Sequence, residues 1–283
     1  MNTPMMIELL AIVAMSLSIA AVWSPVRHAW IGMYIMFIGL ALLTQWIKPI
    51  ALMSLCVFAL VVWLSTLKKT KLLSIGVNTL VVLVTLVAAA RLAPGFTHVS
   101  LLEDTQLSNN TGWSALRFSA DKVSIGLFLL VAHRELLCKT LKECTRILAP
   151  NIVSIIVGCL GIYVVGLIVG FATLDVTLSP LVLVWLFRNL IFTVVAEEAF
   201  FRGFIQSRLQ SSIASPHAPI YALLISAVLF GLVHIYGGWE YGLLATMAGI
   251  LYGYVFMKTG RIELSIVAHS VLNTGHVLLL SYP

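Results

Sequence analysis

Residues 181–202 read LVLVWLFRNLIFTVVAEEAFFR, and this stretch indicates both the fold class and the place where chemistry is expected. Its apolar run from Leu181 to Phe201 has about the 20 residues that a helix needs to cross a bilayer. Similar runs recur along the chain, with short polar breaks between them. The chain has 283 residues and only 10% of them are charged, so a soluble core is excluded.

These runs predict an all-α fold, a polytopic transmembrane helix bundle with about 9 to 10 spans. The expected spans are Met5–Trp23, Ala29–Trp46, Ile50–Leu67, Leu72–Ala90, Ile152–Leu174, Leu181–Phe201, Pro219–Tyr236, Tyr241–Met257 and Ile262–Ser281. The segment Val123–Leu137 is shorter. It fits a tenth crossing, a re-entrant helix or an interfacial amphipathic helix.

Three parts are expected along the chain. Residues 1–93 form an N-terminal membrane region of four helices, and residues 151–283 form the core that carries the chemistry. Between them, residues 94–150 form a polar loop and the short amphipathic or crossing helix, and the loop is expected over Pro94–Lys122. The net charge of +6 does not indicate a nucleic-acid partner, because the basic residues lie in short loops between spans. The expected partner is the lipid bilayer.

Two adjacent acidic residues, Glu197 and Glu198, lie near the end of an apolar run. A charged side chain near the bilayer centre costs at least about 2.5 kcal/mol, so the pair requires an explanation. On a helix, Glu198 stacks on Arg202 four residues later, in the favourable order. Glu197 has Phe201 at that position, so it needs a partner from another helix or a proton of its own. A carboxyl group in that state suits a general base. The alternative is that both glutamates reach water at the membrane interface.

Two further apolar helices carry histidines. His234 ends one run, with Phe230 one turn earlier on the same face, and His269 shares a face of the last span with Asn273. A lone histidine in a membrane helix is more often a packing residue, but three such helices can converge on one polar cavity. Convergence predicts a hydrolase. Glu197 is then the base, His234 holds and polarises the water, and His269 and Asn273 donate hydrogen bonds to the oxyanion.

A zinc site is the rival interpretation. Two histidines and a glutamate can bind Zn²⁺ and leave one position open for water. However, the sequence lacks an H-E-x-x-H helix, and Asn273 is a poor zinc ligand. We therefore expect catalysis without a metal, with Zn²⁺ as the second alternative.

The motifs Glu-Glu-x-x-x-Arg, Phe-x-x-x-His and His-x-x-x-Asn, each on its own apolar helix, resemble the CPBP family of intramembrane endopeptidases. This family includes type II CAAX prenyl endopeptidases and bacteriocin-processing, Abi-type proteins. The resemblance covers about Pro180 to Ser281 and implies that residues 151–283 contain a protease core of the glutamic type. It implies catalytic roles for Glu197, His234, His269 and Asn273, and supporting roles for Glu198, Arg202 and Phe230.

The resemblance also implies a class of substrate. Members hydrolyse a peptide bond of a membrane-associated protein or peptide, such as a leader, a C-terminal sorting tail or a CAAX-like end. Residues 121–127, DKVSIGL, look like a stretch of short bacterial members associated with sorting tails. We therefore expect a multi-pass protein of the bacterial inner membrane.

Two other functions remain as alternatives. One is a non-catalytic bacteriocin self-immunity or scaffold protein, although the intact set of motif side chains argues against it. The other is a transporter that uses the same side chains as a proton relay. Transporters more often show Gly/Pro-broken helices paired in two halves, and we find no such symmetry.

Overall fold

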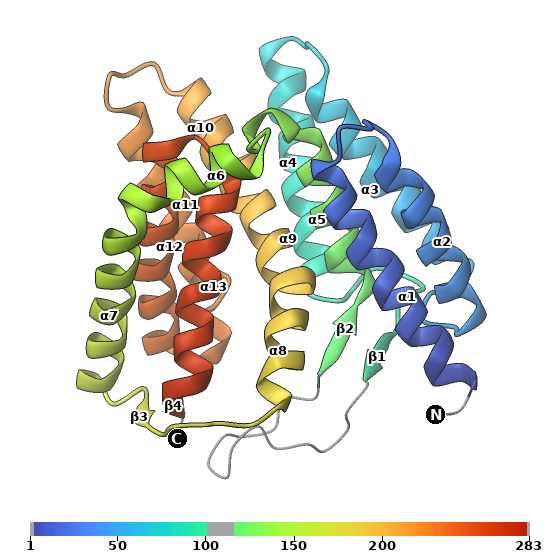
Figure 1. The fold of residues 1–283 in the computed structure, drawn as a ribbon. Helices are drawn as coiled ribbons and strands as arrows, with labels where there is room; N and C mark the ends of the chain where they lie inside the picture. The colour runs from blue at the N-terminus through green and yellow to red at the C-terminus, as the bar shows by residue number, and fades with distance from the viewer. Residues whose placement is uncertain (1–2, 101–115, 282–283) are drawn as a thin grey trace. The chain divides into compact units, whose positions relative to one another are not determined.

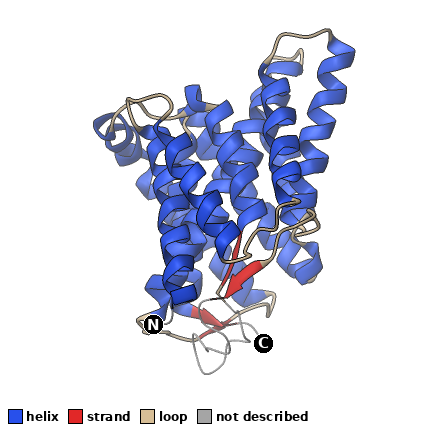
Figure 2. Ribbon diagram, turned by 90° about the vertical axis from the view of Figure 1, so that its right-hand side faces the viewer, coloured by secondary structure: helices blue, strands red, loops and turns tan. Residues whose placement is uncertain are grey.

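The computed structural model describes residues 3–100 and 116–281 of the chain (Figure 1). Secondary structure in these residues is almost entirely helical, and the described strands form two short antiparallel pairs (Figure 2). The pairs are β1 (His98–Ser100) with β2 (Arg117–Ser119), and β3 (Thr173–Leu174) with β4 (Leu280–Ser281). The all-α prediction is therefore confirmed. Contacts divide the chain into two units, and each unit has its own packing.

Unit 1 contains the described residues within 1–103 and 116–134, together with Ile191–Ala196. Its helices are α1 (Thr3–Ala20), α2 (Ala29–Leu43), α3 (Ala51–Thr66), α4 (Lys71–Ala89) and α5 (Ala120–Ala132). Helix α5 is the most enclosed of these, because its residues 123–127 are all buried. Helix α5 is therefore an interior helix of unit 1, and the three alternatives for Val123–Leu137 stay predictions.

The connection between α4 and α5 corrects a sequence prediction. Pro94–Lys122 was expected to be a solvated loop, but it contains β1, β2 and the first turn of α5. Phe96 stacks on Phe58, with ring centroids 6.4 Å apart, and the Thr97 backbone N–H donates to the Trp46 carbonyl at 3.0 Å. The described ends of this connection are therefore packed structure. Its acidic and asparagine residues at 103–110 lie outside the described residues.

Unit 2 contains Glu135–Leu190 and the described residues from Glu197 onward. Its helices are α6 (Leu141–Leu148), α7 (Ile152–Ile168), α8 (Leu181–Asn189), α10 (Ser207–Ser212), α11 (Ala218–Leu232), α12 (Trp239–Thr259) and α13 (Ile262–Leu279). Helix α12 packs against α7, α11 and α13, which places the last two apolar helices side by side (Figure 1).

The run that carries the two glutamates is interrupted by two π-helical segments. Helix α8 leads into a π-helical segment, Leu190–Val194, and then into α9 (Val195–Glu198). A second π-helical segment, Ala199–Gln206, follows α9 and leads into α10. The helical run therefore continues to Ser212, well beyond the Phe201 end that hydropathy predicts. π-Helical turns, with i→i+5 hydrogen bonds, are rare and occur frequently at functional sites.

Glycines bring α11 and α12 into close contact. A Cβ added at Gly231 would lie 2.7 Å from the Gly242 carbonyl oxygen, and one at Gly249 would lie 2.9 Å from the Ala227 Cα. Real side chains do not approach backbone atoms so closely. The small residues therefore allow the two helix backbones to touch, as they do in many membrane bundles.

Helix length and composition bear on membrane spanning. Among the described residues, four helical stretches are long and apolar enough to cross a bilayer: Thr3–Trp23, Lys71–Ala89, Leu141–Ile168 and Ile262–Leu279. Helices α2, α3 and α11 are apolar but shorter. The total of 9 to 10 spans stays a prediction from the sequence. The domain limits 1–93, 94–150 and 151–283 also stay predictions.

Candidate active site

A buried ion pair joins Glu198 to Arg202. Arg202 Nε lies 3.2 Å from Glu198 Oε2, and both side chains are 0% exposed. Arg202 also donates from Nη2 to the Gly249 carbonyl at 2.9 Å. Its guanidinium lies 5.1 Å from the Phe230 ring centroid and 5.3 Å from that of Tyr252. The predicted Glu198–Arg202 pairing is confirmed, and Arg202 is an interior residue rather than a surface anchor.

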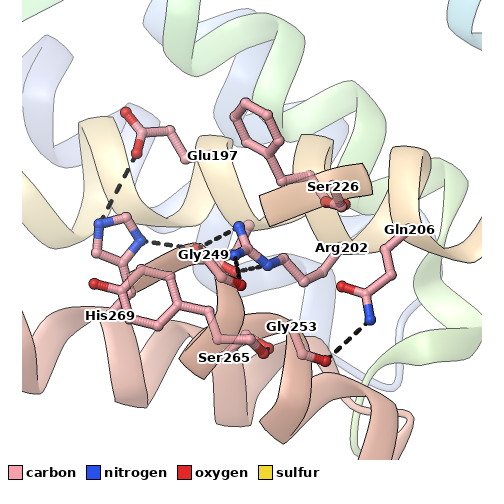
Figure 3. A network of polar contacts seen from close by, with 11 residues as sticks. Glu197, Arg202, Gln206, Ser226, Gly249, Gly253, Ser265 and His269 are labelled. Atoms are coloured by element: carbon pink, nitrogen blue, oxygen red, sulfur yellow. Dashed lines mark hydrogen bonds and ion pairs between the residues drawn. The ribbon is translucent and has the colours of Figure 1, made fainter. Parts of the chain in front are cut away.

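His269 of α13 faces Glu197 with one ring nitrogen (Figure 3) and Glu198 with the other. Its Nδ1 is 2.8 Å from Glu198 Oε1, and its Nε2 is 3.9 Å from Glu197 Oε2. A carboxylate only accepts hydrogen bonds, so the Glu198 contact assigns a proton to Nδ1 and directs Nε2 toward Glu197. His269 is therefore a neighbour of Glu197 from another helix, at a distance longer than a hydrogen bond.

The two glutamates differ in their access to solvent. The Glu197 side chain is 13% exposed, whereas the Glu198 side chain is 0% exposed. Both carboxylates contact His269, and Glu198 also pairs with Arg202, but of the two glutamates only Glu197 is exposed to solvent. Glu197 is therefore the more accessible of the two carboxylates.

Aromatic rings fix the orientation of His269. Tyr252 of α12 stacks on the imidazole, with centroids 4.5 Å apart and an interplanar angle of 15°. The Phe230 ring meets it edge-on at 5.8 Å and 83°. Sequence reasoning missed Tyr252, because an aromatic residue in an apolar helix carries no signal of its position beside a particular histidine.

His234 lies directly after the last turn of α11. Its Nδ1 is 2.7 Å from the Phe230 carbonyl oxygen. A carbonyl only accepts, so Nδ1 donates and Nε2 is left as an acceptor. The His234 ring centroid lies 4.5 Å from that of Phe230 and 5.4 Å from that of Tyr241. Because Phe230 contacts both histidines, the structure brings the second and third motifs together.

Asn273 lies one turn after His269 on α13. Its Nδ2 donates to Asn189 Oδ1 of α8 at 2.9 Å, and Asn189 is buried. Asn189 stands outside the three motifs, so it was not among the predicted site residues. The signal that could have placed it there is a polar side chain in an apolar run, two turns before Glu197.

The described residues do not fit a zinc site. Among residues 3–100 and 116–281, no group of three or more His, Cys, Asp or Glu side chains could hold a metal ion. Within the described residues, the zinc alternative therefore lacks a set of three donors.

Comparison with known proteins gives one match. Residues 178–275 match the family model described as type II CAAX prenyl endopeptidase Rce1-like. Neither the curated proteins nor the solved structures include a significant match. The matched segment contains every residue of the three motifs, from Glu197 to Asn273, which confirms the resemblance found in the sequence. This chain is therefore an integral membrane protein whose residues 178–275 match the Rce1-like type II CAAX prenyl endopeptidase domain.

Proposed function

We propose that this protein is a glutamic-type intramembrane endopeptidase in which Glu197 activates the water that hydrolyses a peptide bond. The observation that supports this most is the unequal environment of two adjacent glutamates. Glu198 is enclosed by Arg202 and by His269 Nδ1, whereas Glu197 is partly exposed and faces His269 Nε2. A general base needs such access to water, together with a partner that shares its proton.

The first step takes place at the water molecule. The Glu197 carboxylate accepts a proton from water, and the water oxygen forms a bond to the scissile carbonyl carbon. His234 Nε2, left as an acceptor by the Phe230 contact, accepts the second hydrogen of the water and orients it. The oxyanion that develops takes a hydrogen bond from Asn273. One Nδ2–H of Asn273 is given to Asn189, so the second is available for this contact.

His269 carries the proton onward. In its neutral form the ring has given its only N–H to Glu198, so Nε2 cannot donate at the start of the reaction. Glu197 passes the proton from water to Nε2, which then donates to the oxyanion beside Asn273. When the C–N bond breaks, the same proton goes to the leaving amine. The oxyanion role expected for His269 therefore begins only after the water has been activated.

The proposed substrate is a membrane-bound protein or peptide, cleaved in a leader, a C-terminal sorting tail or a CAAX-like end. The proposed location is the bacterial inner membrane. Support comes from the family match and from the position of the site, whose residues come from apolar helices. A segment held in or near the bilayer can reach such a site without leaving the membrane.

The test compares wild-type protein with Glu197→Gln in membranes that contain co-expressed membrane proteins. Mass spectrometry of their C-terminal and leader peptides reports cleavage. Glu135→Gln is the matched control, because this exposed carboxylate lies outside the site. We expect products with wild type and Glu135→Gln, and none with Glu197→Gln. Unchanged products in a folded Glu197→Gln variant would contradict the proposal and favour a mechanism that does not use this base.

A further inference from the structure

The residues directly before Glu197 are held in unit 1. Ile191–Ala196 belongs to that unit, although the remainder of the motif helix belongs to unit 2. The Phe192 ring meets Phe118 edge-on, with centroids 4.9 Å apart, and stacks on Trp46 at 6.4 Å. Val194, Val195 and Ala196 are 0%, 4% and 6% exposed. This segment is therefore a packed part of unit 1 up to the residue that precedes Glu197.

One glycine of α5 makes the closest approach to this segment. A Cβ added at Gly126 would lie 2.6 Å from the Ala196 Cα and would also meet the Ala196 Cβ. Non-bonded carbon atoms need about 3.5 Å, so one of the two backbones would have to move by about 1 Å. Helix α5 has little room to retreat, because Ile125 and Leu127 beside the glycine are each 1% exposed. The backbone of Ala196 would therefore be displaced.

We propose that Gly126 is a positioning residue for Glu197. Helix α9 contains both Ala196 and Glu197, so a displacement of the Ala196 backbone is carried to the next residue. Contact with Gly126 would thus set the distance between the Glu197 carboxylate and His269 Nε2, which is 3.9 Å. The inference rests on the proposed role of Glu197 as the base. It also gives a function to the glycine of DKVSIGL, which lies outside the family match at 178–275.

The test measures cleavage by Gly126→Ala and Gly126→Val. A misplacement of about 1 Å can reduce the rate about 100-fold, so kcat should fall by up to that factor while KM changes little. Gly39→Ala and Gly76→Ala are matched controls in the same unit, because an added Cβ there meets nothing within 4 Å. Both controls should keep wild-type kcat. Adding Ala196→Gly to Gly126→Ala removes the Cβ contact and should restore part of kcat.

A second readout does not depend on activity. Infrared difference spectroscopy follows the titration of the Glu197 carboxyl, which is assigned by its loss in Glu197→Gln. Gly126→Ala should shift the midpoint of this titration, and the two control variants should not. Wild-type kcat and midpoint in Gly126→Ala would overturn the inference, as would equal losses in the controls. If Glu197→Gln still cleaves, the proposed function fails, but the midpoint still tests the positioning.

Discussion

The buried pair between Glu198 and Arg202 allows a quantitative prediction. The perturbation is a double-mutant cycle of Glu198→Gln, Arg202→Met and the double variant. Removing one partner of a buried ion pair leaves an uncompensated charge and costs about 3 to 5 kcal/mol. The 3.2 Å separation and the 0% exposure of both side chains place this pair in that class. The double variant leaves neither charge, so it should be far more stable than the sum of the single effects.

The expected coupling energy follows from the other contacts of Arg202. In Glu198→Gln the guanidinium keeps its contacts with the Gly249 carbonyl and with the rings of Phe230 and Tyr252. The loss in free energy of unfolding for this variant should therefore be about 3 kcal/mol. Arg202→Met also loses these contacts and should cost more. We expect a coupling of about 2 to 3 kcal/mol, at the upper end for residues in one network.

The assay is equilibrium unfolding in detergent micelles, followed by tryptophan fluorescence. Glu143 and Arg261 supply the matched control, because their ion pair is 2.8 Å long but 27% and 25% exposed. The same cycle with Glu143→Gln and Arg261→Met should give a much smaller coupling, because solvent screens an exposed ion pair. Additivity of the Glu198 and Arg202 variants within about 0.5 kcal/mol would refute the argument, as would a larger coupling in the control.

Three further predictions concern other contacts. Asn189→Leu should lower kcat in the peptide-cleavage assay by about 10-fold, because Asn273 loses the contact that orients it. This is a smaller effect than the loss of a whole oxyanion donor. Asn189→Asp keeps a hydrogen-bond acceptor for Asn273 and should retain more of the wild-type kcat. Gly231→Ala should lower the free energy of unfolding by about 1 to 3 kcal/mol, because the added Cβ would meet the Gly242 carbonyl. Gly161→Ala, where an added Cβ meets open space, should have a free energy of unfolding within about 0.5 kcal/mol of wild type. Treatment with a zinc chelator should leave cleavage unchanged, and a loss that added Zn²⁺ restores would contradict the metal-free mechanism.

The fold could be predicted from the sequence where apolar length alone determines the element. Helix α13 begins at Ile262, as predicted, but it ends at Leu279 because Leu280–Ser281 pairs with Thr173–Leu174. Two-residue strands have no hydropathy signal, since their pairing is set by segments distant in sequence. The helix after Glu198 also runs longer than predicted. Hydropathy ends it near Arg202, but ion pairing buries Arg202, and Gln206 is buried by donating to the Gly253 carbonyl at 2.9 Å.

The grouping of the motif residues could be predicted more completely than their individual contacts. Motif spacing selects Glu198 and Arg202 as an intrahelical pair, because residues four apart share a helix face. No spacing rule places His269 between the two glutamates, stacks Tyr252 on its ring or sets Asn189 beside Asn273. Each of these contacts joins different helices, so it depends on helix packing that a single sequence does not reveal.

In the proposed mechanism, the network gives the two adjacent glutamates different parts. Arg202 neutralises Glu198, and the paired carboxylate can then hold the Nδ1 proton of His269. Because that proton is on Nδ1, the unprotonated Nε2 faces Glu197. Glu198 therefore sets the orientation and the tautomer in which His269 meets Glu197. Loss of Glu197 should therefore remove activity from a stable protein. Loss of Glu198 should first weaken the fold and the orientation of His269, because its carboxylate is buried against Arg202 and His269.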